Sequence, residues 1–252
     1  MADAPLEITF PVLVRYLARL DGRDKLLRLI QYGSRLCMWS AEASSALGAK
    51  DPSAQWYKKS YKGISLHRKA FRLFKWAQEY HSACTFMDDA KLSPVKRNLN
   101  VLNRASLAAY LVNDNINWVI GLKLQPWAPD RFKAWAYRAR FTAAVCQAVL
   151  LWMDWRALKR KRAALTGGAL RSEEQRADDR AALAALKRKE WELTLKTVKV
   201  VGDVVVYASA TAKVTPLLPG LLAQNDGVVG AAGVLATIAA QILILRKVQP
   251  KK

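Results

Sequence analysis

One uncharged segment near the end of the chain limits the folds that are open to it. Residues 227–245 read GVVGAAGVLATIAAQILIL, nineteen residues in which Gln241 is the single strongly polar side chain. As a helix that rises about 1.5 Å per residue, this segment reaches about 28 Å, close to the roughly 30 Å thickness of a bilayer's hydrocarbon core. Soluble cores rarely keep so long an uncharged run, so the segment predicts a transmembrane helix. A buried helix of a soluble protein is the alternative.

The charges and small residues around this segment predict its orientation and packing. Basic residues, Arg246 and Lys247, follow it directly, whereas residues 214–226 contain no Lys or Arg. By the positive-inside rule the C-terminus then faces the cytosol. A face of small residues, suited to close helix packing and to self-association, is formed by Gly227, Gly230, Gly233 and Ala236. If the N-terminal region is also cytosolic, a second span is required, and the stretches 200–222 and 134–153 are the two candidates.

The prolines predict an all-α fold. They stand at positions 5, 11, 52, 94, 126, 129, 216, 219 and 250 and leave the proline-free segments 12–51, 53–93, 95–125 and 130–215. Proline in a helix interior costs roughly 3 kcal/mol, so its confinement to these borders indicates long helices between them. We expect a bundle of long amphipathic helices with a C-terminal transmembrane helix. The expected regions are 1–162, a charged linker at 163–180 that includes Gly167-Gly168, and 181–252.

The first long segment contains a basic amphipathic helix. The apolar stripe changes phase at Asp21-Gly22, where Asp21 suits an N-cap, so the second helix is expected to begin near Gly22 and to run to about residue 47. Its apolar face is Leu26, Leu29, Ile30, Gly33 and Cys37. Arg28 and Arg35 lie opposite that face, and Arg23 and Lys25 flank it. Such a helix either inserts its apolar face into a membrane surface or packs in an ordinary bundle.

The net charge requires an anionic partner. The chain has 41 Lys and Arg against 20 Asp and Glu, a formal charge of +21. In the second segment Arg68, Lys69 and Arg72 are interleaved with aromatic residues, which suits either single-stranded nucleic acid or a lipid headgroup zone. The apolar C-terminal segment favours lipid over nucleic acid. The cations expected to contact anionic lipid are therefore Arg23, Lys25, Arg28, Arg35, Arg68, Lys69 and Arg72.

The residues that enzymes use are sparse. The two histidines, His67 and His81, are too far apart on one helix to share a metal, and Cys37, Cys84 and Cys146 have no metal-like spacing. Because no Walker loop, dinucleotide fingerprint or nucleophile elbow occurs either, we expect no catalytic residue, no metal and no cofactor. The acidic residues inside apolar helices are Asp114 and Asp203, and they are the candidate polar residues of a channel.

Four stretches of the chain resemble the peroxin-11 family of peroxisomal membrane proteins. They are residues 21–33 (DGRDKLLRLIQYG), 68–73 (RKAFRL), 114–118 (DNINW) and 202–206 (GDVVV), and the similarity extends over most of the length. The resemblance implies an amphipathic helix that inserts into the cytosolic leaflet and bends it. It also implies self-association, recruitment of dynamin-type fission machinery with its adaptor, and both termini in the cytosol. Some members of the family are thought to conduct small solutes.

The sequence therefore predicts an integral peroxisomal membrane protein that elongates the membrane through basic amphipathic helices and promotes fission and proliferation. Two alternatives stay open. One is a solute-permeable membrane channel, which would need polar residues lining at least two spans. The other is a soluble, basic, helical nucleic-acid-binding protein, which would need the segment 227–245 to be a soluble core.

Overall fold

The computed structural model describes residues 7–45, 52–166, 173–214 and 225–249. Within these ranges the chain forms eight α-helices and no strand, which confirms the all-α prediction. The helices are α1 (Phe10–Ala18), α2 (Leu20–Ser45), α3 (Ser53–Ala70), α4 (Lys75–Asp88), α5 (Pro94–Gly121), α6 (Pro129–Thr166), α7 (Glu173–Ala212) and α8 (Asp226–Val248).

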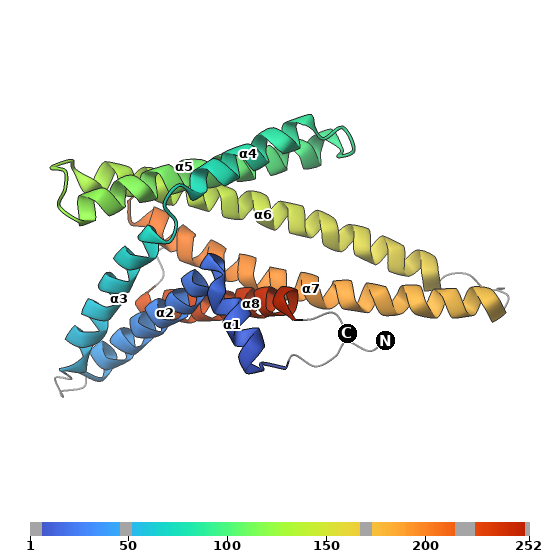
Figure 1. The fold of residues 1–252 in the computed structure, drawn as a ribbon, viewed down its shortest axis with the longest axis horizontal. Helices are drawn as coiled ribbons and strands as arrows, with labels where there is room; N and C mark the ends of the chain where they lie inside the picture. The colour runs from blue at the N-terminus through green and yellow to red at the C-terminus, as the bar shows by residue number, and fades with distance from the viewer. Residues whose placement is uncertain (1–6, 46–51, 167–172, 215–224, 250–252) are drawn as a thin grey trace.

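The helices form two layers that enclose a common interior (Figure 1). One layer contains α1, α2, α8 and α7, and the other contains α4, α5 and α6. Each long helix packs against its neighbours in the spatial order α3, α2, α8, α7, α6, α5, α4, and α3 also touches α5. This last contact closes the arrangement into a ring, so each helix of the ring has one side that faces inward and one that faces outward.

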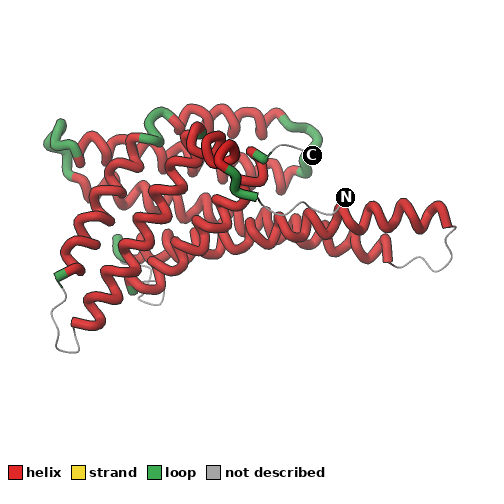
Figure 2. The backbone as a smooth tube through the Cα atoms, turned by 60° about the horizontal axis from the view of Figure 1, so that its bottom comes forward, coloured by secondary structure: helices red, strands yellow, loops and turns green. Residues whose placement is uncertain are grey.

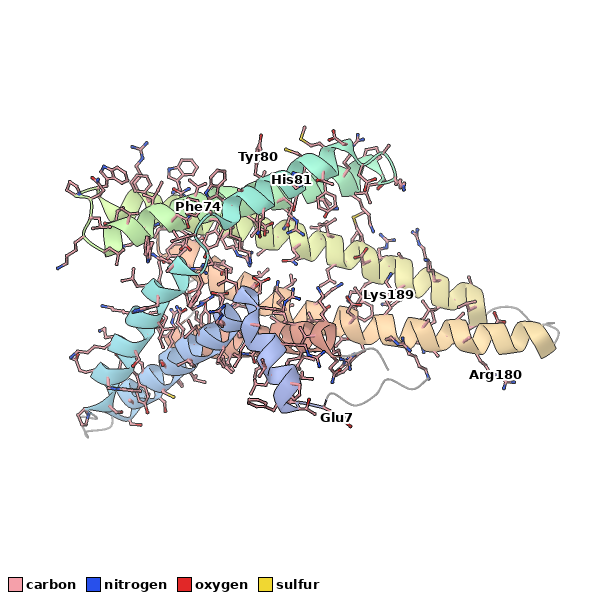
Figure 3. All side chains as sticks on the ribbon, in the orientation of Figure 1. Glu7, Phe74, Tyr80, His81, Arg180 and Lys189 are labelled. Atoms are coloured by element: carbon pink, nitrogen blue, oxygen red, sulfur yellow. The ribbon has the colours of Figure 1, made fainter. Side chains whose placement is uncertain are left out.

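Helices α6 and α7 extend beyond the rest of the bundle as a two-helix arm (Figure 2). They have 38 and 40 residues, and the hydrogen bond from Trp155 Nε1 to Thr197 Oγ1, 3.0 Å long, joins them. Arg180 and Lys189 lie on the α7 side of this arm (Figure 3). Of the expected linker at 163–180, residues 163–166 belong to α6 and 173–180 to α7, and the glycine pair at 167–168 lies outside the described residues.

The first helix break lies two residues before the expected one. Helix α1 ends at Ala18, Arg19 has an extended ψ of 132°, and α2 begins at Leu20 rather than near Gly22. The Arg23 amide donates to the Arg19 carbonyl at 3.2 Å, so Arg19 takes the N-cap place expected of Asp21. The Asp21 carboxylate instead pairs with Lys75 at the start of α4. The Asp21 side chain, which the local pattern assigned to capping, therefore forms a tertiary ion pair instead.

The proline-free segment 53–93 is not one helix, as the proline pattern predicted, but two. Helix α3 ends at Ala70 and α4 begins at Lys75, and between them Phe74 has a left-handed φ of 58°. Phe74 and Tyr80 point away from the bundle (Figure 3). Ion pairs on both sides of the break hold it, because Arg72 pairs with Asp114 on α5 and Lys75 with Asp21 on α2. Nothing in the local sequence marks this break, since it contains neither Pro nor Gly.

Helix α8 contains the predicted transmembrane segment 227–245. Among the described residues it is the one helix that is long and apolar enough to cross a membrane, with a mean hydropathy of 2.3. Only 39% of its most apolar window is buried within the chain, whereas the core helix of a soluble protein is mostly buried. Two stretches were considered for a second span. The stretch 134–153 on α6 does not meet the same criterion, and residues 215–222 of the stretch 200–222 lie outside the described residues.

The small residues of α8 let it pack closely against α2. A Cβ atom at Gly233 would lie 2.3 Å from the Tyr32 ring, and one at Gly227 would lie 2.5 Å from the Trp39 ring. At the other end, Gln241 Nε2 donates to the Lys25 carbonyl at 3.3 Å. Residue numbers rise along α2 as they fall along α8, so the two helices are antiparallel over the whole length of the predicted span.

Candidate functional site

Helix α2 turns its charged side toward the interior of the bundle and much of its apolar side outward. Asp24, Arg28 and Gln31 are 6%, 4% and 6% exposed, whereas Leu26 and Ile30 are 40% and 46% exposed. A helix of a soluble bundle does the reverse, because its apolar stripe faces the core. Charged residues that face inward with apolar residues outside are the arrangement found in membrane bundles.

The most buried charge in the described part of the chain is Asp203 on α7, which is 1% exposed. Its carboxylate forms an ion pair with Arg28 of α2 and lies 3.2 Å from Arg140 Nη2 of α6 and 3.4 Å from Lys199 Nζ. The Arg140 guanidinium also stacks over the Tyr207 ring at 4.5 Å. One carboxylate therefore joins three helices and partly neutralises three cations in the interior.

A second buried ion pair joins α2 to α3. Arg68 Nε donates to Asp24 Oδ1 at 3.0 Å, and Arg68 Nη1 donates to Gln31 Oε1 at 2.5 Å. Lys25 Nζ also lies 3.2 Å from Asp24 Oδ2, so this buried carboxylate is paired with two cations.

A third ion pair joins the turn after α3 to α5. Arg72 Nη2 lies 2.8 Å from Asp114 Oδ2, and the same guanidinium lies 5.8 Å from the centre of the Tyr110 ring. Two buried polar atoms nearby, Arg72 Nε and Asn117 Oδ1, have no hydrogen-bond partner among the described residues. Buried polar atoms without a partner are uncommon in folded proteins and call for an explanation.

These ion pairs surround a chamber of about 400 Å³. Side chains of α2, α3, α5, α6 and α7, and of the turn after α3, line it. Its charged residues are six cations and one carboxylate: Arg35, Arg68, Lys69, Arg72, Lys133, Lys213 and Asp114. Its tyrosines are Tyr32, Tyr61, Tyr110, Tyr137 and Tyr207. The chamber is thus polar, strongly basic and rich in hydroxyl groups.

The cations expected to contact lipid differ in how far they are exposed. Arg23 is exposed, and Lys25, Arg35, Lys69 and Arg72 are half-buried. Arg28 and Arg68 are buried in the ion pairs described above and do not reach the surface of the molecule. The sequence pattern identified a charged side of α2 but did not tell which side faces inward, since that depends on whether water or lipid surrounds the bundle.

The apolar residues expected to enter the membrane lie mostly on the outside. Leu26, Ile30 and Cys37 are exposed, and Leu29 and Gly33 are half-buried. The small residues of α8 are occupied within the chain: the three glycines face α2, and Ala236 packs at Gly202 of α7, where an added Cβ would approach it to 2.8 Å. In this structure that face is closed to a second copy of the chain, so self-association would use another surface.

The two acidic residues singled out for a channel occupy different places. Asp114 lines the chamber, whereas Asp203 lies in the three-cation cluster outside the chamber lining. Sequence reasoning missed the partners Arg140 and Lys199. Lys199 was within reach of a sequence argument, because it precedes Asp203 by one helical turn. Arg140 is 63 residues away from Asp203 and carries no local signal.

In the described ranges, no three His, Cys, Asp or Glu side chains lie close enough together to hold a metal ion. The two histidines lie on different helices, His67 on α3 and His81 on α4, rather than on the single helix expected.

Replacing Asp203 should destabilise the bundle strongly. The change Asp203→Asn leaves the buried Arg28 and Arg140 and the half-buried Lys199 without their carboxylate, and breaking a buried ion pair costs about 3–5 kcal/mol of unfolding free energy. Asp154→Asn is the matched control, because its pair with Lys96 is half-exposed and such pairs contribute about 0–1 kcal/mol. Thermal unfolding of both variants in detergent checks this, and equal losses would contradict a charged core centred on Asp203.

Comparison with known proteins gives a consistent set of relatives. Residues 11–243 match the family model described as Peroxisomal biogenesis factor 11 (PEX11). The chain is 32% identical over 108 residues to Peroxisomal membrane protein 11E of Arabidopsis thaliana, which covers 43% of this chain and 41% of that protein. It is 34% identical over 120 residues to Peroxisomal membrane protein PMP27 of Saccharomyces cerevisiae, 46% of each chain.

A rice relative, Peroxisomal membrane protein 11-4 of Oryza sativa subsp. indica, is 32% identical over 126 residues, 49% of this chain and 51% of that protein. The chain thus spans about half or less of the length of the curated relatives it matches. No solved structure matches it.

Proposed function

The chain belongs to the peroxisomal biogenesis factor 11 (PEX11) family, and from that premise we propose that it is an integral protein of the peroxisomal membrane that remodels and elongates this membrane. The observation that carries the proposal is the outward apolar surface of the wall formed by α2, α8 and α7. Each of the three helices has an exposed apolar row. These rows are Leu26 and Ile30 on α2, Val228, Leu235 and Ile238 on α8, and Val198 and Val201 on α7. An exposed apolar surface of this kind marks a membrane or protein contact.

The three rows lie on neighbouring helices and point away from the charged interior. Leu26 and Ile30 are on the side of α2 opposite Arg28, and Val198 and Val201 are on the side of α7 opposite Asp203. Lipid around such a wall would contact aliphatic side chains, while the ion pairs stay inside the ring. This supports membrane contact along the length of α2, because α2 runs antiparallel to the candidate span α8.

This arrangement differs from the one the family resemblance implied for α2. A helix that lies in the plane of one leaflet cannot also run along a helix that crosses the bilayer. We therefore propose that α2 acts while packed on α8, at the same depth in the membrane. Although α2 is not apolar enough to meet the criterion that α8 meets, its buried charges are paired inside the ring, and on this proposal it supplies the second long helix which the topology requires. Its polar side, with Arg28 and Gln31, then faces the chamber and not the aqueous surface.

One end of α8 has the features of a membrane–water interface. Arg246 and Lys247 lie in its last turn, and the Arg246 guanidinium lies 5.8 Å from the centre of the exposed Trp191 ring. Tryptophan and basic residues both favour the headgroup zone. The short helix α1 packs at this same end through Val12 and Leu245, and its Phe10 is 77% exposed.

The packing of α1 also supports both termini being on one side of the membrane. Gln249 Nε2 donates to the Glu7 carbonyl at 3.4 Å, so the first and last described residues lie together at the basic end of α8. By the positive-inside rule we propose that this is the cytosolic side. The apolar side chains of α1 in one leaflet would enlarge that leaflet relative to the other and so favour curvature.

Charges placed on the outer row of α2 should abolish membrane remodelling. In Leu26→Glu/Ile30→Glu two carboxylates replace aliphatic side chains that face lipid, so liposome tubulation by the reconstituted chain should be lost while the helical content is kept. Val95→Glu/Leu102→Glu is the matched control, because both residues are exposed on α5 in the other layer. Electron microscopy of the liposomes measures the extent of tubulation. Full tubulation by the α2 variant would refute lipid contact by α2.

The chamber favours a second candidate function, the passage of small solutes. Polar residues from α2, α3, α5, α6 and α7 line it, as a solute path through a bundle requires. Filling the chamber with Ala210→Phe should then slow the release of trapped glucose from proteoliposomes, because Ala210 is one of its lining residues. Ala105→Phe, at an exposed position of α5, is the control. Equal release by both variants and the unaltered chain would refute passage through the chamber.

A further inference from the structure

We propose that the basic chamber binds a phosphate group, carried either by a small free anion or by a phosphorylated lipid headgroup. The six cations that line it come from α2, α3, the turn after α3, α6 and the turn after α7, so they approach a central anion from several sides. Such a distribution suits a compact, multiply charged anion, whereas a single carboxylate would be satisfied by one guanidinium.

The carboxylates nearby do not balance these cations. Asp24 pairs with Arg68, and Asp114 pairs with Arg72. Asp226 is shared, because Arg35 Nη2 lies 2.5 Å and Lys213 Nζ 3.6 Å from the same oxygen. Three carboxylates thus face six cations. The chamber keeps a positive excess that an anion would neutralise.

Two lysines carry most of this excess. Within the described residues, no carboxylate lies within ion-pair distance of Lys69, although Asp114 lines the same chamber, and the ion pair of Lys133 is with Asp130, which is 95% exposed and lies 3.5 Å away. A pair so open to water contributes little. Lys69 extends from α3 and Lys133 from α6, and both line the chamber, so a phosphate between them would bridge two helices whose backbones do not pack against each other.

The chamber also has the size and the donors that a phosphate needs. Its volume of about 400 Å³ admits a phosphate or pyrophosphate group but not a nucleic-acid strand. The unpartnered Arg72 Nε and the five tyrosine hydroxyls supply further donors around it. In a partly enclosed site, charge attracts more strongly than it does at an open surface, since less water screens it.

This inference does not rest on membrane remodelling, and its test is separate from that of the proposed function. Isothermal titration calorimetry on the full chain in detergent, at constant ionic strength, measures binding of two probes, sodium pyrophosphate and dioctanoyl phosphatidylinositol 4-phosphate. Dioctanoyl phosphatidylinositol, which lacks the phosphomonoester, is the reference. Binding of pyrophosphate alone assigns the chamber to a free anion, and binding of the phosphorylated lipid alone assigns it to a headgroup. Binding of neither probe overturns the proposal.

The variant Lys69→Gln/Lys133→Gln places the binding in the chamber. It should raise the dissociation constant by about tenfold or more, because two charge-assisted contacts are lost. The control Lys58→Gln/Lys62→Gln removes the same charge from exposed positions of α3 and should leave binding unchanged. Equal weakening in both would show screening by net charge alone and would overturn the proposal.

A measurement on the unaltered chain covers the case in which the chamber variant fails to fold. Pyrophosphate should slow the acetylation of Lys69 and Lys133 by acetic anhydride, read by mass spectrometry, and should leave the rates at Lys58 and Lys62 unchanged. No protection of the two chamber lysines would overturn the assignment.

Discussion

The cluster of Arg28, Arg140 and Lys199 around Asp203 is the interaction on which the rest of the structure depends. It joins α2, α6 and α7 across the interior, where ionised groups remain stable only when they are paired. Once this cluster is fixed, the charged side of α2 has to face inward. The apolar rows of α2 and α7 then have to face outward, and this leaves an aliphatic outer wall around a polar interior.

The same constraint relates the two halves of the molecule to each other. Because Arg28 reaches Asp203, α2 lies beside α8, and the glycines of α8 allow the close approach. The ring then closes through α3 and α5, and the chamber is the space that the paired side chains leave between them. The outer wall and the basic chamber are therefore two results of one packing arrangement: the wall supports membrane contact, and the chamber supports binding of a small ligand.

The parts of this fold that local patterns determine were predictable, and those that long-range pairing determines were not. The proline spacing predicted an all-α fold but not every helix break. The uncharged run 227–245 predicted α8, which begins one residue earlier and ends three residues later. The stripe of Leu26, Ile30 and Cys37 was also visible in the sequence. The break at Phe74 was not, because ion pairs from Arg72 and Lys75 to distant carboxylates hold it. Nor was the inward direction of Arg28 and Arg68, because their partners, Asp203 and Asp24, lie 175 and 44 residues away along the chain.

The proposed packing of α2 along α8 within the membrane can be tested by cysteine cross-linking. A Cβ atom at Gly230 would lie 3.1 Å from the Leu36 Cβ, slightly nearer than the roughly 3.5–4.5 Å of a disulfide, so a small separation of the two helices would allow the bond. In full-length protein in peroxisomal membranes, with the native cysteines replaced by serine, Leu36→Cys/Gly230→Cys should cross-link rapidly on mild oxidation. The mismatched pair Leu36→Cys/Leu243→Cys should not. Failure of the matched pair to cross-link, together with labelling of its Leu36→Cys thiol by a water-soluble maleimide, would show that α2 does not pack along α8 within the membrane.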